Sequence, residues 1–84
     1  MDQSYIKILG LLINDRGFDA VRLQSILTTY GNIIKTRLGV NHPVEKQNIK
    51  ALMLFELFGD REEMINLENE LKEMEGIQVP TMEF

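Results

Sequence analysis

The sequence contains no cysteine and only one histidine, His42. The missing cysteines exclude disulfides, thiolate catalysis and cysteine-based metal sites, and one histidine cannot build a multi-histidine metal centre. Basic residues are also scarce, because 9 lysines and arginines stand against 13 aspartates and glutamates, which leaves a net charge of −4. A nucleic-acid binder needs a basic surface to neutralise phosphates. We therefore expect no direct contact with nucleic acid, no metal, no other cofactor and no catalytic residues.

Long hydrophobic runs are absent as well. The apolar run at 6–13 is too short to span a bilayer, and it lacks the basic flank and the cleavage site of a signal peptide. We therefore expect a cytoplasmic protein without membrane contact. The length of 84 residues and the hydrophobic content of 44% predict one small folded domain over residues 1–84.

Six segments with regular patterns follow one another along the chain. Strand patterns occupy 6–13, 33–40, 49–58 and 77–84, and helical patterns occupy 18–30 and 60–75. A buried helix is the alternative for 49–58, because periodicity alone does not separate the two there. With right-handed crossovers, the order βαββαβ predicts an α+β, ferredoxin-like sandwich. It consists of one four-stranded antiparallel sheet with two helices on one face.

Helix-boundary residues support this reading of the two helices. Gly31 follows the first helix, where glycine can take the left-handed conformation after the last turn. Asp60 is a suitable N-cap for the second helix, and Glu63 completes a capping-box pattern. Within that helix, Glu68 and Lys72 are spaced for an i,i+4 ion pair.

The strands differ in how apolar their two faces are. The first and third strands are apolar on both faces, which is typical of central strands in this topology. The second strand carries Lys35 and Arg37, and the last contains Pro80, and both features suit edge strands. Gly10 leaves room for a close neighbour on its side of the first strand.

Two helices cover only one face of a sheet, so the other face would expose apolar side chains. Such a patch usually marks an interaction site, and a second copy of the chain, a partner protein or an apolar ligand would cover it. A homo-oligomer, dimer or tetramer, is favoured because symmetric assemblies dominate. The alternative is that the C-terminal segment or the 41–48 loop covers the face. The candidate interface residues are Lys7, Leu9, Leu11, Ile13, Leu52 and Leu54.

A small-ligand site is the second functional interpretation. Asn14, Asp15, Arg16 and Gly17 join a predicted central strand to a helix, where backbone N–H groups can bind an anion. The alternative is a helix-capping turn with no ligand. Arg37 is a further candidate for an anionic ligand, with edge-strand protection as its alternative role.

The segment 23–40 resembles the signature of the iron-only hydrogenase system regulators, a family of small proteins. In that family a helix ends in Tyr-Gly, and an isoleucine pair leads to Arg-Met-Gly-Ile. The corresponding positions here read Tyr30-Gly31, then Ile33-Ile34, then RLGV at 37–40. The similarity continues through 63–79. Thr36 replaces a glycine of the family pattern, and the stretches at 41–43 and 45–48 differ.

The resemblance implies an ACT-like domain akin to the C-terminal domain of the nickel-responsive repressor. It implies an oligomer that senses a small-molecule effector, but the histidine and cysteine ligands of the nickel regulator have no counterparts here. We therefore expect a non-enzymatic regulatory or ligand-sensing module. A structural or adaptor protein that holds a partner protein is the alternative, and a small enzyme on the same scaffold is a third hypothesis, because this fold hosts many functions.

Overall fold

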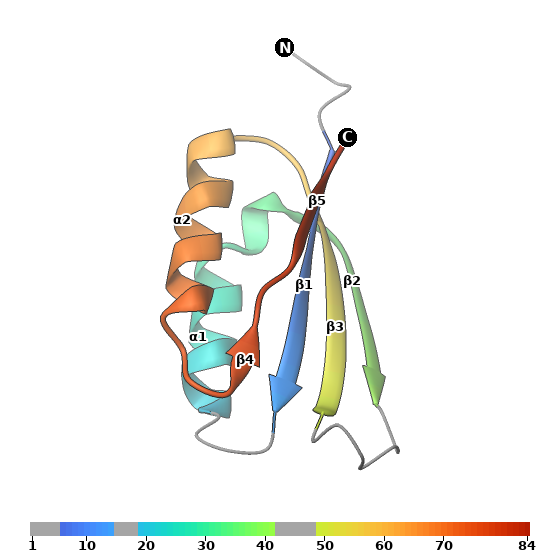
Figure 1. The fold of residues 1–84 in the computed structure, drawn as a ribbon. Coiled ribbons are helices and arrows are strands. Elements are labelled where there is room, and N and C mark those ends of the chain that lie inside the picture. The colour runs from blue at the N-terminus through green and yellow to red at the C-terminus, as the bar shows by residue number, and fades with distance from the viewer. Residues whose placement is uncertain (1–5, 15–18, 42–48) are drawn as a thin grey trace.

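The computed structural model describes residues 6–14, 19–41 and 49–84, which form a sheet covered on one side by helices (Figure 1). The elements in chain order are β1 (Lys7–Asn14), α1 (Ala20–Thr29), the 3-10 turn η1 (Gly31–Ile33), β2 (Ile34–Asn41), β3 (Ile49–Leu57), α2 (Arg61–Lys72), β4 (Ile77–Gln78) and β5 (Thr81–Glu83). The predicted α+β, ferredoxin-like fold is confirmed, and 49–57 is a strand.

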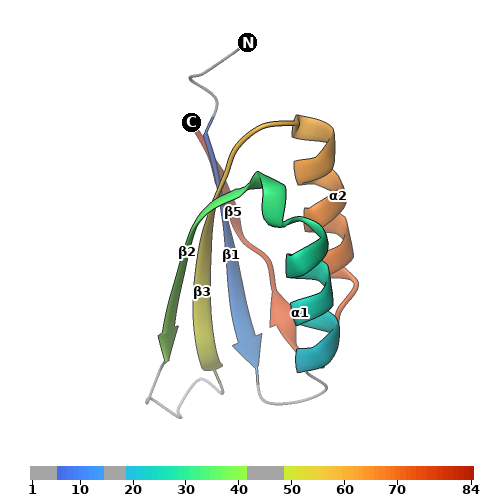
Figure 2. The ribbon, with the colours of Figure 1, turned by 180° about the vertical axis from the view of Figure 1, so that it is seen from behind.

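The sheet has the order β2-β3-β1-β4, and β5 pairs with β1 on the same edge as β4. All these pairings are antiparallel. The two strands that are apolar on both faces, β1 and β3, are central, and β2 is an edge, as predicted. The view from behind shows α1 and α2 side by side on one face of the sheet (Figure 2). The arrangement leaves the other face without helices.

The last predicted strand is split in two by Pro80. Proline has no N–H to donate to a ladder, so β4 ends at Gln78 and β5 begins at Thr81. The carbonyl of Pro80 accepts a hydrogen bond from the N–H of Gly10 at 2.8 Å. A Cβ atom at Gly10 would lie 3.2 Å from the Cγ of Pro80. Gly10 therefore allows the proline segment to pass close to β1, as predicted.

The hydrophobic core lies between the sheet and the two helices. Its members are Leu9, Leu11, Ile13, Leu23, Ile26, Leu27, Tyr30, Ile33, Phe55, Leu57, Met64, Leu67, Leu71 and Met74. They occupy one stripe of each helix and one face of β1 and β3. Val21 lies off the stripe of α1 and is 81% exposed.

The end of α1 differs from the prediction. Among the described glycines only Gly59 and Gly76 have positive φ angles, so Gly31 does not take the left-handed conformation. Instead the chain keeps turning in the right-handed sense into η1, and the N–H of Ile33 donates to the carbonyl of Tyr30 at 3.1 Å. At α2 the N-cap is confirmed, because the carboxylate of Asp60 accepts the N–H of Glu62 at 2.9 Å.

We expect Gly59→Ala to destabilise the protein by about 1–2 kcal/mol, because a side chain at a left-handed residue meets its own backbone. Gly59 has φ +98° and joins β3 to α2. The matched control is Gly31→Ala, since a Cβ atom there has open space within 4 Å and the φ is not positive. That change should be neutral or stabilising by up to about 1 kcal/mol. Urea denaturation of both variants tests this, and equal losses would contradict the backbone explanation.

Candidate functional site

Of the ligand site predicted from the sequence, the described part of the chain includes only Asn14 and Arg37. Asn14 ends β1, and its N–H donates to the carbonyl of Gly76 at 2.6 Å. The three other loop candidates, Asp15, Arg16 and Gly17, lie outside the described residues. Arg37 is opposite Phe55, which is opposite Leu9. Leu9 precedes Asn14 by five residues on β1. Arg37 therefore lies about 17 Å from Asn14, measured along the strands.

Arg37 has a structural contact of its own. Its guanidinium carbon lies 6.0 Å from the centroid of the Phe55 ring, which is within the range of a weak cation–π interaction. Arg37 therefore extends from the edge strand β2 toward the ring of Phe55, a core aromatic on the neighbouring strand β3. This position fits the edge-strand role better than a ligand site shared with Asn14.

Four of the six candidate interface residues were assigned to the wrong face of the sheet. Lys7, Leu9, Leu11 and Ile13 point toward the helices, and each is at most 6% exposed within the subunit. They cannot form an outward surface, because the subunit's own helices already cover them. The remaining two, Leu52 and Leu54, lie on the opposite face and are half-buried.

The uncovered face of the sheet, called the open face below, is largely apolar. Strand alternation and pairing register place on it Ile6, Ile8, Gly10, Leu12, Thr36, Leu38, Leu52, Leu54, Glu56, Gln78, Met82 and Phe84. Leu38, Met82 and Phe84 are the most accessible of its large apolar side chains, at 53%, 56% and 68%. A contiguous surface of this kind is typical of an interaction site.

Glu56 is a charged residue within the open face. Its carboxylate accepts a hydrogen bond from the hydroxyl of Thr36 at 3.0 Å and lies 4.0 Å from the ammonium group of Lys35. The register of β2 against β3 shifts between Ile34 and Thr36. The ammonium group of Lys35 partly offsets the negative charge of Glu56, and the Thr36 hydroxyl satisfies one of its oxygens, so the face carries a paired charge.

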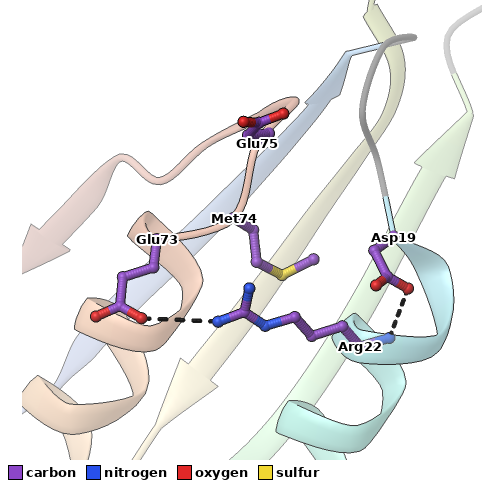
Figure 3. A pocket seen from close by; sticks show the side chains of 5 residues that line it. All are labelled: Asp19, Arg22, Glu73, Met74 and Glu75. Atoms are coloured by element: carbon purple, nitrogen blue, oxygen red, sulfur yellow. Dashed lines mark hydrogen bonds and ion pairs between the residues drawn. The ribbon is translucent and has the colours of Figure 1, made fainter.

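A separate polar cleft of about 290 Å³ lies between the start of α1 and the end of α2 (Figure 3). Its lining residues are Asp19, Arg22, Glu73, Met74 and Glu75. Asp19 is the N-cap of α1 and accepts the N–H of Arg22 at 3.0 Å. The Arg22 guanidinium reaches across to Glu73 at 3.6 Å, and Met74 is buried beneath.

The cleft brings three carboxylates and one guanidinium together over an apolar floor. The side chains of Arg22 and Glu73 are 47% and 71% exposed, so their ion pair is weak and open to exchange. This charge balance favours ligands with a cationic group over polyanions. Sequence reasoning missed the cleft, because about fifty residues separate its two halves and no local motif joins them. The N-cap position of Asp19 was the only local signal.

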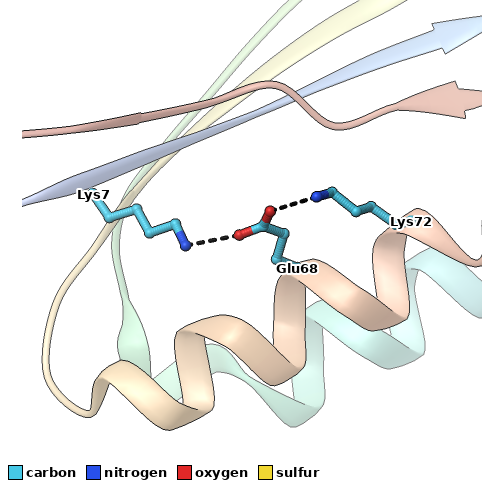
Figure 4. A network of polar contacts seen from close by, with 3 residues as sticks. All are labelled: Lys7, Glu68 and Lys72. Carbon is cyan, nitrogen blue, oxygen red and sulfur yellow. Dashed lines mark hydrogen bonds and ion pairs between the residues drawn. The ribbon is translucent and has the colours of Figure 1, made fainter.

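A partly buried ion-pair network joins β1 to α2 (Figure 4). The ammonium group of Lys7 is 2.7 Å from one carboxylate oxygen of Glu68, and that of Lys72 is 2.7 Å from the other. The predicted Glu68–Lys72 pair is therefore confirmed. Burial alone would raise the pKa of Glu68, but hydrogen bonds from the two lysines outweigh it, so the pKa lies below its ordinary value of 4.5.

A second polar contact ties the end of α1 to α2. The hydroxyl of Tyr30 donates a hydrogen bond to the carboxylate of Glu70. This bond raises the pKa of Tyr30 above its ordinary value of 10.0, and burial and the charges of Glu70 and Glu63 raise it further. The contact holds the Tyr30-Gly31 junction against the helix layer.

We expect Glu70→Gln to lower the pKa of Tyr30 toward its ordinary value, because the neutral amide removes the charge that stabilises the phenol. The ultraviolet absorbance of the phenolate reports this in a Tyr5→Phe background, where Tyr30 is the remaining tyrosine. Since the pKa is raised in the folded state, this contribution to stability is complete below about pH 10 and is lost as the pH rises through the folded pKa. An unchanged titration in Glu70→Gln would contradict the assignment.

The described residues hold neither a metal-ligand cluster nor a helix able to span a membrane. No group of three or more histidine, cysteine, aspartate or glutamate side chains in 6–14, 19–41 and 49–84 is placed to hold a metal ion. Across the same residues, neither helix has the length and apolar character that crossing a bilayer requires. His42, the one histidine, lies outside them.

Comparison with solved structures identifies a protein with the same fold. The structure of uncharacterized protein TM1266 from Thermotoga maritima superposes with a TM-score of 0.77. It is 24% identical in sequence, and the match covers 94% of this chain and 95% of that chain. No protein-family profile and no curated protein matches the sequence. The similarity therefore establishes the architecture.

Proposed function

We propose that this protein is a non-enzymatic, cytoplasmic regulatory module that senses a small ligand. It acts as a homo-oligomer through its open face. The observation that carries the proposal is the exposure of large apolar side chains along that face, from Leu38 on β2 to Met82 on β5. A single subunit leaves this surface in water, which a second subunit would relieve.

The resemblance of 23–40 to the iron-only hydrogenase system regulators supports an ACT-like regulatory role. Tyr30 and Gly31 of that signature form the junction between α1 and η1, and Arg37 and Leu38 place one side chain on each face of β2. The signature thus coincides with the segment that connects the helix layer to the open face. Such a position suits a module in which ligand binding and assembly influence each other.

The polar cleft at Arg22 is the proposed ligand site. A thermal-shift screen with amino acids, nucleotides and divalent metals tests it, because a ligand at one hundred times its Kd stabilises the native state by about 2.7 kcal/mol. We expect a zwitterionic amino acid to raise the Tm, because its ammonium group can face the carboxylates of the cleft and its carboxylate can pair with Arg22, and we expect nucleotides to leave the Tm unchanged. The variant Arg22→Gln should abolish the upshift. A shift that Arg22→Gln retains in full would place the ligand elsewhere.

An adaptor that holds a partner protein is the second candidate, and the open face favours it equally. The same screen separates the two, because an adaptor would show no response to any compound in the set. Light scattering tests the oligomer independently. A protein that stays strictly monomeric at micromolar concentration would contradict the homo-oligomeric form of the proposal.

A further inference from the structure

We infer that the open face is closed by a second copy of this chain in a two-subunit, face-to-face assembly. The inference rests on the proposed function and specifies its partner and stoichiometry. It concerns the face that carries Leu38, Leu54 and Met82, opposite the helices. Four observations select this occupant: the extent of the face, its charge, the position of the C-terminal segment and the number of apolar faces.

The extent of the open face approaches that of a standard dimer interface. The central strands β1 and β3 have 8 and 9 residues. At about 3.3 Å per residue and about 4.8 Å between four strands, the flat footprint is on the order of 500 Å². Projecting side chains enlarge the accessible area beyond that footprint, toward the roughly 800 Å² per partner of a standard interface. A small apolar ligand would cover only part of so wide a surface.

The charge on the open face permits self-association. Two copies that each presented an unpaired carboxylate would place like charges in a desolvated layer, which is unfavourable. Glu56 is instead held by Lys35 and Thr36 of its own subunit. Each copy therefore brings an apolar surface with a locally compensated charge, which is compatible with an identical partner.

Neither of the two predicted covers from the subunit itself offers the apolar area of a partner. The C-terminal segment, one of the predicted covers, forms β5 in the plane of the sheet, with Met82 opposite Ile8. The other predicted cover includes residues 42–48, which read HPVEKQN and contain a single aliphatic side chain. A segment of this composition could bury little of the apolar surface of the open face.

The geometry favours two subunits over a larger assembly. Each described subunit presents one sheet face that lacks helices (Figure 2), and one self-complementary face closes with a two-fold axis. The β2 edge carries the exposed residues Lys35 and Arg37, which oppose strand addition there. The helix layers would then form the two outer surfaces of the dimer.

Light scattering with matched aspartate variants tests the inference. Leu38→Asp and Met82→Asp introduce a charge at opposite edges of the open face, where both side chains are more than half exposed. Both should fold as monomers, with an increase in the dimer Kd of at least about tenfold, or about 1.4 kcal/mol. The control Val21→Asp makes the same kind of change on the helix layer, at 81% exposure, and should remain dimeric. Circular dichroism confirms that each variant is folded.

We expect a wild-type mass of two chains of 9.7 kDa. If the wild type is oligomeric and both open-face variants keep that mass, the interface lies elsewhere, and the oligomeric form of the proposed function survives. An assembly through the β2 edge would behave in this way, because backbone pairing does not use the side chain of Leu38. A wild-type tetramer that either variant reduces only to dimers would overturn the two-subunit form. A monomeric wild type would overturn the inference, while the ligand screen would still decide the sensing role.

Discussion

Replacing Glu68 with alanine is expected to destabilise the fold by about 3 kcal/mol, because it removes the partner of a buried charge. The ammonium group of Lys7 is bonded to Glu68 at 2.7 Å, and Lys7 is only 4% exposed. Without the carboxylate, the ammonium group of Lys7 must either reach for solvent or remain unpaired beneath α2. Each of these outcomes lowers the free energy of unfolding, which urea denaturation measures.

Substitutions at both ends of the pair separate the loss of the ion pair from the burial of its two side chains. Lys7→Met should have a smaller effect than Glu68→Ala, because Glu68 keeps Lys72 as a partner and is more exposed. The double variant Lys7→Met/Glu68→Leu should recover most of the stability that Glu68→Ala loses, since a well-packed apolar pair can replace a buried ion pair. The control is Lys72→Met, which removes an exposed i,i+4 partner and should cost about 0.5 kcal/mol. A loss in Glu68→Ala no larger than in Lys72→Met would refute the buried-charge account.

The same pair predicts how stability depends on pH. Because the folded pKa of Glu68 lies below its ordinary value of 4.5, its contribution is complete above that value. The contribution is lost as the pH falls through the lowered folded pKa. The difference in unfolding free energy between wild type and Glu68→Ala should therefore shrink in acid. If this difference in unfolding free energy stayed constant from neutral pH into acid, the link between Glu68 protonation and stability would be contradicted.

Leu67→Ala is expected to have the other large effect, a loss of about 3 kcal/mol or more. Leu67 is fully buried in the core, where α2 meets the sheet. Truncation removes apolar contact and leaves a cavity that a small, close-packed core cannot fill by collapse. For a domain of this size, each kcal/mol corresponds to about 4–8 °C in Tm. Thermal and urea unfolding at one fixed protein concentration measure the loss.

The neighbouring residue Ile65 provides the control for Leu67. It lies on the same helix, has a similar side chain and is 52% exposed, so Ile65→Ala should change stability by no more than about 0.5 kcal/mol. If Leu67→Ala leaves too little folded protein to measure, Leu67→Met serves in its place and should cost less than about 1.5 kcal/mol. Equal losses at positions 65 and 67 would mean that α2 does not pack as described.

Local patterns in the sequence were sufficient to predict the architecture. The strands β1 and β3 are apolar on both faces, and Pro80 indicates that the last strand lies at an edge. The apolar stripe of each helix points to the core without any knowledge of its partner. Asp60 marks the start of α2 by a local hydrogen bond. These features depend on interactions within a few residues, so they can be read from the chain alone.

The functional surfaces depended on the tertiary structure. Because β1 is apolar on both faces, alternation could not decide which face the helices cover, and the face of Lys7 was predicted to be an interface although the helices bury it. Lys7 is buried because Glu68, sixty-one residues away, supplies its counter-charge. The cleft at Arg22 likewise exists only where the start of α1 meets the end of α2. Periodicity determines that a strand has two faces, but long-range packing decides which of them meets water.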